Sequence, residues 1–203
     1  MKRFKNIIEQ IGLLGKYENN VKDERCFFDQ QFIGTKWGIT APSLAKFLGR
    51  TPLQAEMKYL SKIEAIQLLF YKYWIGQNLN LLTNDSVATL LFSNLVNIGT
   101  NKMRPIVQKA LVSLGQSIPF YNVFTTQGIG RINLVDQKRL FNQLYTTSKL
   151  SYKQTKSHLK KYHLIGQLQR INFISSGATV QNLISKQAQQ KLYNAFNPKT
   201  PNK

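Results

Sequence analysis

The chain has very few residues of the types that hold metals or form disulfides. Among its 203 residues there are one cysteine, Cys26, and two histidines, His158 and His163. A single cysteine excludes an intramolecular disulfide and a cysteine-based zinc site, and two histidines make a poor metal centre. We therefore expect no metal site and no cofactor, and we expect Cys26 to be a buried or incidental thiol.

Acidic residues are scarce as well. Nine Asp and Glu stand against 28 Lys and Arg, which gives a net charge of +19. The imbalance is uneven, because residues 1–85 hold 12 basic and 8 acidic residues, whereas residues 86–203 hold 16 basic residues and only Asp136. A positive field of this size is typical of a protein with a polyanionic partner, such as nucleic acid, anionic lipid or an acidic cell-wall polymer. A lysine-rich solvated surface is the plainer alternative.

Long apolar runs are absent too. No run approaches the roughly 18 residues that are needed to span a bilayer. The N-terminal stretch MKRFKNIIEQIGLLG is basic and then apolar, but polar residues interrupt it and no small-residue cleavage site follows. We therefore expect neither a transmembrane segment nor a signal peptide.

Helical periodicity dominates what remains. Residues 4–14 place apolar side chains on one helical face, and Gly15 ends the pattern. Residues 16–39 and 116–133 read as loops, the second with short extended pieces. Because alternation with a period of two is almost missing, the sequence predicts an all-α protein. Further helical patterns follow Pro42, Thr51 and Ser61 and cover residues 85–98, 103–114 and 134–144.

The character of the chain changes near residue 148. Two basic, Gln-rich amphipathic stretches follow, separated by Ser-Ser-Gly at 175–177. The prediction therefore assigns residues 1–147 to a domain, 148–196 to a basic helical extension and 197–203 to a flexible tail. Lysines interleaved with tyrosines in the extension could neutralise phosphates, so nucleic-acid binding is one alternative, and a solvated face or a protein-docking surface is the other. These residues are Lys149, Tyr152, Lys153, Lys156, Lys160, Lys161 and Tyr162.

Five short motifs occur in order along residues 4–145. They are Gly34 to Thr40 (GTKWGIT), Glu64-Ala65 followed by Tyr71 and Tyr73-Trp74, Phe92 with Val96-Asn97 and Gly99, Gln108 with Ala110-Leu111, and Gly128-Ile129-Gly130. Together they resemble the N-acetylmuramidases of glycoside hydrolase family 108, the lysozyme-like endolysins of phages and prophages. The resemblance implies a lysozyme-like helical domain with residues 86–147 as its peptidoglycan-binding portion, and peptidoglycan as its partner.

In such a domain the Trp-Gly-Ile-Thr segment would line a sugar-binding cleft. An indole offers a flat apolar face to a pyranose, and a glycine lets the backbone approach the ligand. The alternative is that Trp37 anchors a loop to the core. The resemblance implies substrate-binding roles for Tyr17, Thr35, Trp37, Gly38, Tyr73, Trp74 and Asn97.

One departure from the family concerns catalysis. Where the family has Glu-Gly-Gly-Tyr this chain has Leu14-Gly15-Lys16-Tyr17, so the catalytic glutamate is replaced by Leu14. Glycosidases need a carboxylic acid to protonate the leaving oxygen, and losing a general acid lowers the rate roughly 10²- to 10⁴-fold. Substitute acids could be Glu18 or Asp23, with Thr35 positioning a water. Either Asp23 or Asp29 could be the counterpart of the family's second acid.

Other acids of the family pattern are also replaced. Ser93 and Gln127 stand where the family has aspartates. Glu64 is retained, either as an ion-pair partner of Lys58 or Lys62 or as a group that faces the substrate.

We therefore arrive at three hypotheses. The first is a catalytically degenerate muramidase that binds peptidoglycan or forms part of a phage particle or injection apparatus. The second is an active muramidase with Glu18 or Asp23 as the acid, and the third is a nucleic-acid-binding phage protein. The predicted location is a phage virion or the host cytoplasm or cell envelope.

Overall fold

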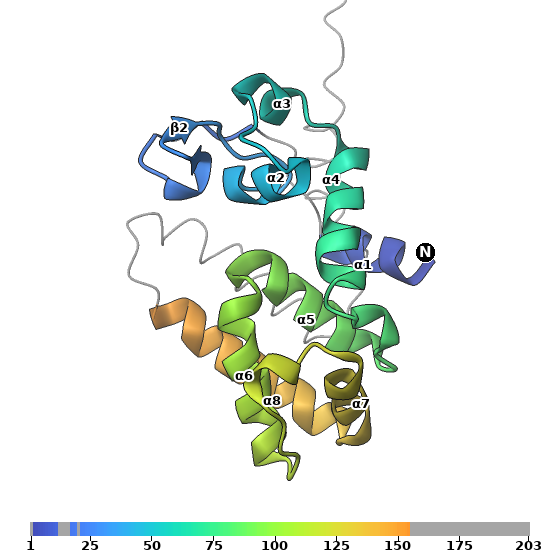
Figure 1. The fold of residues 1–203 in the computed structure, drawn as a ribbon. Helices are drawn as coiled ribbons and strands as arrows, with labels where there is room; N and C mark the ends of the chain where they lie inside the picture. The colour runs from blue at the N-terminus through green and yellow to red at the C-terminus, as the bar shows by residue number, and fades with distance from the viewer. Residues whose placement is uncertain (1, 12–16, 20, 155–203) are drawn as a thin grey trace, which may run out of the picture.

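The computed structural model describes residues 2–11, 17–19 and 21–154, and within them helices dominate. The prediction of an all-α protein is confirmed. In Figure 1 the β-hairpin, α2 and α3 form one group and α5 to α8 another, with α1 and α4 between the two. The elements are α1 (Lys2–Ile11), η1 (Glu24–Cys26), β1 (Phe27–Phe28), β2 (Gln31–Phe32), α2 (Ala41–Leu48), α3 (Gln54–Tyr59), α4 (Lys62–Leu69), the π-helical turn η2 (Phe70–Ile75), η3 (Leu79–Leu81), α5 (Asp85–Ile98), α6 (Thr100–Ser113), η4 (Phe120–Asn122), α7 (Thr126–Leu134) and α8 (Gln137–Gln154).

A cluster of aromatic rings joins α1, η2 and α5. The ring of Phe4 lies with its centroid 4.9 Å from that of Phe70, 5.6 Å from that of Trp74 and 5.4 Å from that of Phe92. Phe4, Trp74 and Phe92 are buried. The pairs of Phe4 with Phe70 and with Phe92 are edge-to-face, and such pairs contribute about 0.5–1.5 kcal/mol each beyond the burial of their area. The cluster therefore fixes the first helix against the middle of the chain.

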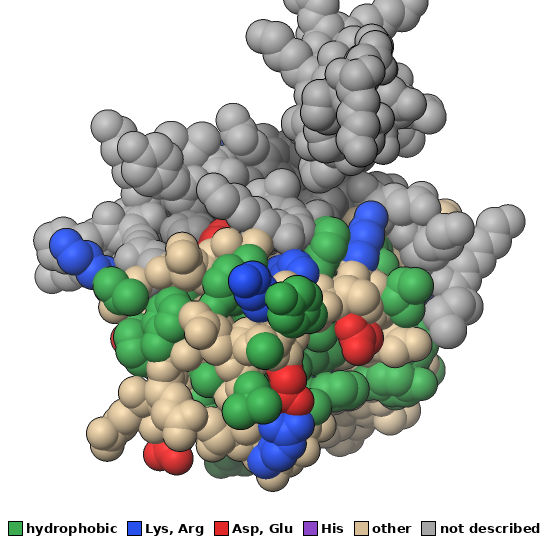
Figure 2. All heavy atoms as spheres, turned by 90° about the horizontal axis from the view of Figure 1, so that it is seen from above, with side chains coloured by type: hydrophobic (Ala, Val, Ile, Leu, Met, Phe, Trp, Pro, Cys, Tyr) green, Lys and Arg blue, Asp and Glu red, His purple; other side chains and the backbone are tan. Residues whose placement is uncertain are grey.

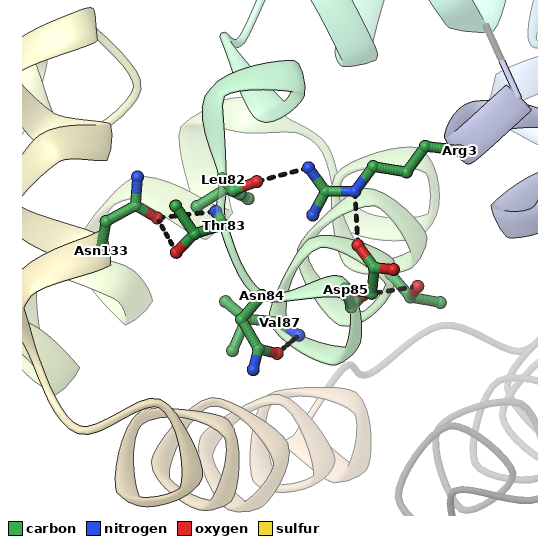
Figure 3. A network of polar contacts seen from close by, with 8 residues as sticks. Arg3, Leu82, Thr83, Asn84, Asp85, Val87 and Asn133 are labelled. Carbon is green, nitrogen blue, oxygen red and sulfur yellow. Dashed lines mark hydrogen bonds and ion pairs between the residues drawn. The ribbon is translucent and has the colours of Figure 1, made fainter.

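Polar contacts hold the segment just before α5 from two sides (Figure 3). From α1, Arg3 donates from Nη1 to the carbonyl of Leu82 and from Nε to Asp85 Oδ1 at 2.5 Å. From α7, the side-chain oxygen of Asn133 accepts from the backbone N–H of Thr83 at 3.0 Å. Asn84 caps α5 by accepting from the N–H of Val87 at 3.0 Å. The start of α5 is thus fixed by both neighbouring parts of the fold.

Helix α5 is the centre of the C-terminal group. Its sequence has a single charge, Asp85, at its first residue, and nine of its residues are buried, because α6 and α8 pack against it. A buried hydrogen bond of 2.8 Å from Asn94 to Ser148 joins α5 to α8. Buried amides and hydroxyls are tolerated only when they are hydrogen-bonded, so this pair specifies how the two helices meet.

Side-chain caps set the starts of the helices in the N-terminal group. Thr40 accepts from the N–H of Ser43 at the start of α2. Ser61 and Glu64 form a reciprocal capping box at the start of α4, in which Glu64 accepts from the N–H of Ser61 at 2.8 Å. Hydrogen bonds from Ser61 lower the pKa of Glu64 below its ordinary value. The carboxylate of Glu64 therefore serves helix capping, and no ion pair with Lys58 or Lys62 occurs among the contacts of the described residues.

The prediction of a loop at residues 116–133 is wrong for the second half of this range. Helix α7 begins after Thr125, which caps it by accepting from the N–H of Gly128 at 3.3 Å. The two glycines suggested a loop, because glycine weakens a helix. Gly128 is needed for another reason: a Cβ there would lie 2.0 Å from the carbonyl oxygen of Asn122 and 2.3 Å from that of Val123. The short extended pieces expected in this region are absent from it.

The other predicted helices are found with shifted ends. The loop at 16–39 contains the antiparallel pair β1 and β2. Helix α8 continues to Gln154, across the expected division at residue 147, and the predicted helices from 155 to 196 lie outside the described residues. Among the described residues no helix is both long and apolar enough to cross a membrane.

On the face seen from above in Figure 2, basic, acidic and hydrophobic side chains are intermingled. Large hydrophobic residues exposed on α2, α3 and the start of α4 are Phe47, Tyr59 and Ile63. Isolated exposed hydrophobic residues are ordinary on protein surfaces. We assign no function to them.

We expect opposite effects from adding a methyl group at the two glycines of α7. Gly128→Ala should destabilise the protein by several kcal/mol, because its Cβ would meet backbone carbonyls that cannot move independently. Gly130→Ala should be neutral or stabilising by about 0.5–1 kcal/mol, because nothing lies within 4 Å of its Cβ position. Urea unfolding of both variants measures this. Equal stability of the two variants would contradict the packing described for α7.

Candidate functional site

The candidate site is built around two short segments that pair in antiparallel fashion. The N–H of Glu18 donates to the carbonyl of Thr35 at 2.8 Å, and the N–H of Thr35 donates to the carbonyl of Glu18 at 3.0 Å. The hydroxyl of Thr35 also donates to Glu18 Oε2 at 3.1 Å. Thr35 is buried and Glu18 is half-buried. The pairing therefore holds a carboxylate and a hydroxyl side by side.

Tyr17 and Gly34, which directly precede Glu18 and Thr35 in the sequence, stabilise this pairing. The hydroxyl of Tyr17 donates to the carbonyl of Ile33 at 3.0 Å. Gly34 has a φ of +88°, and a Cβ on it would lie 2.5 Å from a ring carbon of Tyr17. Glycine is thus required both by the backbone conformation and by the ring that lies against it. Tyr17 is packed partly on the core, so in this structure its ring supports the site.

Asp23 is occupied by a structural role. Its side chain caps η1 by accepting from the N–H of Arg25, and both of its oxygens accept from the guanidinium of Arg25. The side chain of Asp23 is only 3% exposed. Its hydrogen bonds and charge raise the pKa of Arg25 above the ordinary value. A buried carboxylate in a bidentate ion pair has no proton to give, so we do not include Asp23 in the proposed site.

Asp29, the other aspartate of this loop, lies at the exposed tip of the β1–β2 hairpin. Asp29 and Gln30 are its two turn residues, and both have positive φ. Two central residues of positive φ are characteristic of the type I′ turn, in which aspartate is favoured. Turn formation accounts for this residue.

The Trp-Gly pair predicted to bind sugar forms a second two-residue turn. Lys36 and Ile39 exchange backbone hydrogen bonds of 3.1 and 2.8 Å, and Trp37 and Gly38 between them have φ of +55° and +76°. The indole N–H of Trp37 donates to the carbonyl of Leu60 at 2.9 Å, and its ring packs in part on the core. A Cβ on Gly38 would have nothing within 4 Å. Trp37 is therefore an anchor of the turn, while Gly38 leaves the backbone open to a ligand.

Two of the other predicted binding residues lie in the core. Tyr73 and Trp74 are 7% and 4% exposed, and their rings lie edge-on to that of Phe92. Burial raises the pKa of Tyr73 to about 12. Asn97 lies half-buried in the last turn of α5. None of these side chains is part of the hydrogen bonding around Glu18 and Thr35 that is described above.

A second polar group, which the sequence did not reveal, lies beside the Trp-Gly turn. The ammonium of Lys72 donates to Ser43 Oγ at 2.8 Å, and Ser43 Oγ lies 2.9 Å from Thr40 Oγ1. The ammonium also lies 5.0 Å from the centre of the Tyr73 ring. Burial, and secondarily the charge of Lys46, lowers the pKa of Lys72. No spacing in the sequence could have indicated this group, since Lys72 and Ser43 are 29 positions apart.

Ser93 and Gln127, where the motif resemblance implies aspartates, lie in different surroundings. Ser93 is fully buried in α5, where an aspartate would place a charge inside the core. Gln127 is exposed in the first turn of α7. No cluster of three or more His, Cys, Asp or Glu that could hold a metal occurs in the described part of the chain.

These helices, and the paired segments that precede Trp37, define an all-α protein of the lysozyme-like class. The model of the family described as Glycosyl hydrolase 108 matches residues 14–99, and over that segment the resemblance seen in the motifs is confirmed. Among solved structures, the chain is similar to "Structure of Brucella abortus SagA", with 20% sequence identity and a TM-score of 0.66. That match covers 87% of this chain and 91% of the other, and it bears on the fold alone. No curated protein matches the chain.

The structural role of Asp23 leads to a prediction about stability. Asp23→Asn should destabilise the protein by about 1–3 kcal/mol, because an amide at this buried position cannot neutralise the guanidinium of Arg25. Asp29→Asn is the matched control, since an exposed turn residue of positive φ accepts asparagine. Thermal unfolding of the two variants measures the difference. An Asp23→Asn variant as stable as the control would show that the ion pair does not hold the loop.

Proposed function

We propose that this protein is a muramidase-like binder of peptidoglycan glycan strands that does not cleave them. The observation that carries the proposal is the hydrogen-bonded pair of Glu18 and Thr35 within the family segment, beside the open backbone of Gly38. A carboxylate accepts hydrogen bonds from sugar hydroxyls. A retained site without the family's acid at Leu14 fits binding better than hydrolysis.

The chemistry of glycoside cleavage supports this choice. Hydrolysis requires one carboxylic acid to protonate the leaving oxygen, and a second group to activate water or to attack the sugar. Asp23 is taken up by Arg25, and the Glu18 carboxylate accepts a hydrogen bond from Thr35. An acceptor fixed in this way is suited to holding a hydroxyl. A role as a subunit of a phage particle or injection apparatus would use the same glycan contact.

The competing proposal is an active N-acetylmuramidase with Glu18 as the acid. It is favoured by the partial exposure of Glu18 and by the nearby hydroxyl of Thr35, which could position a water. The two proposals predict different effects of Glu18→Gln. If Glu18 is the catalytic acid, the variant should lose hydrolytic activity and keep its binding to peptidoglycan. If Glu18 serves binding, the variant should lose binding to peptidoglycan.

Co-sedimentation with purified peptidoglycan sacculi tests the proposal. Glu18→Gln and Thr35→Val should each weaken binding about tenfold or more, because each removes part of a hydrogen-bond arrangement that involves a charged group. The suspension should keep its turbidity throughout. Glu24→Gln, an exposed acid in the same loop, is the matched control and should bind like wild type.

The sign of the effect makes this test specific. Replacing Glu18 by glutamine makes a basic protein more positive, so non-specific attraction to anionic sacculi would become stronger. A fall in binding therefore reports the loss of a specific contact. Wild-type protein that does not sediment with sacculi, or variants that bind as well as wild type, would overturn the proposal.

A further inference from the structure

Lys72 is unusual among the lysines of the described chain. Its ammonium is partly buried, and its contacts are a serine hydroxyl and an aromatic face. None of the ion pairs among the described residues includes it. Lysines are seldom withdrawn from water without a carboxylate partner, because desolvation of the charge is costly. The lowered pKa of Lys72 reflects that cost.

The backbone around Lys72 is unusual as well. Residues Phe70–Ile75 form a π-helical turn that follows directly from α4, with the N–H of Gly76 donating to the carbonyl of Tyr71 at 2.9 Å. Such turns are rare, less stable than α-helix and frequent at functional sites. Here the turn carries both the buried rings of Tyr73 and Trp74 and the inward-reaching ammonium of Lys72.

Lys72 reaches the same hairpin as the Glu18–Thr35 pair. The hairpin is closed by the Lys36–Ile39 hydrogen bonds, and Thr35 and Thr40 are the residues just outside them on its two arms. Thr35 bonds to Glu18, and Thr40 lies within hydrogen-bond distance of Ser43, the partner of Lys72. Thr35 and Thr40 directly flank the closing pair, so the two polar groups are attached to the same hairpin.

We propose that Lys72, together with Ser43 and Thr40, binds a carboxylate of the glycan's peptide side chains. This inference rests on the proposed function and deepens it: the ligand would be peptide-bearing peptidoglycan, and neutral glucosamine polymers would bind less well. An ammonium has three N–H donors, and one of them is used by Ser43, so two are left for an anion. The hydroxyls of Ser43 and Thr40 can rotate to donate to the second carboxylate oxygen.

The test compares native sacculi with sacculi whose carboxylates have been converted to neutral amides by carbodiimide coupling. Binding is measured by co-sedimentation in about 0.3 M salt, which screens long-range attraction between exposed charges. Wild-type protein should bind native sacculi about tenfold more tightly than amidated ones, as expected for a charge-assisted contact at a partly desolvated site. Lys72→Met should bind both forms equally, at the level of wild type on amidated sacculi.

Lys46→Met is the matched control. Lys46 lies exposed on α2 and is close enough to influence Lys72, and the change removes the same charge without removing the ammonium at the site. This variant should keep the tenfold preference. Ser43→Ala, which leaves Lys72 in place, should reduce the preference about threefold and serves as a second variant if Lys72→Met does not fold.

The outcomes separate this inference from the proposed function. Wild-type protein that binds native and amidated sacculi equally well overturns the role of Lys72 and leaves glycan binding intact. The role is also overturned if Lys72→Met keeps the preference, or if Lys46→Met loses it to the same extent. Wild-type protein that binds neither preparation overturns both proposals.

Discussion

The antiparallel pairing of Glu18 with Thr35 is the contact on which the rest of the candidate site depends. It closes the loop between them, and that loop contains the ion pair of Asp23 and Arg25. It also starts the hairpin whose turn is Trp37-Gly38, and whose far arm leads into α2 through Thr40. The pairing therefore fixes the hydroxyl beside Glu18 and begins the hairpin that leads to the hydroxyls beside Lys72.

The hydrophobic core and the acidic positions of this chain compare differently with the motif pattern of the family. The aromatic cluster of Phe4, Trp74 and Phe92 joins the first helix to the centre of the fold, and it is built from apolar groups that need no charge. By contrast, Leu14, Ser93 and Gln127 stand at positions where the motif resemblance implies acids. Ser93 is fully buried. A fold whose stability resides in such a core can lose catalytic acids and keep its shape.

Helices and family could be read from the sequence because both leave local signals. Periodic apolar residues gave α1 and α5, and the GTKWGIT motif gave the family segment. The glycines of α7 led to a wrong prediction of a loop. Gly128 does not break the helix, and its missing side chain lets the helix lie close to the carbonyls of Asn122 and Val123. The sequence alone does not distinguish a glycine that ends a helix from one that allows close packing, and only the three-dimensional structure does.

The site was less accessible to sequence reasoning. Tyr73 and Trp74 have the same chemistry whether they face a sugar or a core, and burial alone distinguishes the two. From the sequence, Asp23 could be a catalytic acid, and only the structure shows that it forms an ion pair with Arg25. Lys72 meets Ser43 only because η2 and α2 come together in three dimensions, which no spacing along the chain reports.

The central claim is that the scaffold of a muramidase is present while its proton donor is missing. The most direct measurement is the release of new reducing ends from sacculi by wild-type protein and by Leu14→Glu, which restores the family residue. We predict no release by wild type above a heat-inactivated control, and measurable release by Leu14→Glu. Release by wild type that Leu14→Glu does not increase and Glu18→Gln abolishes would contradict the account.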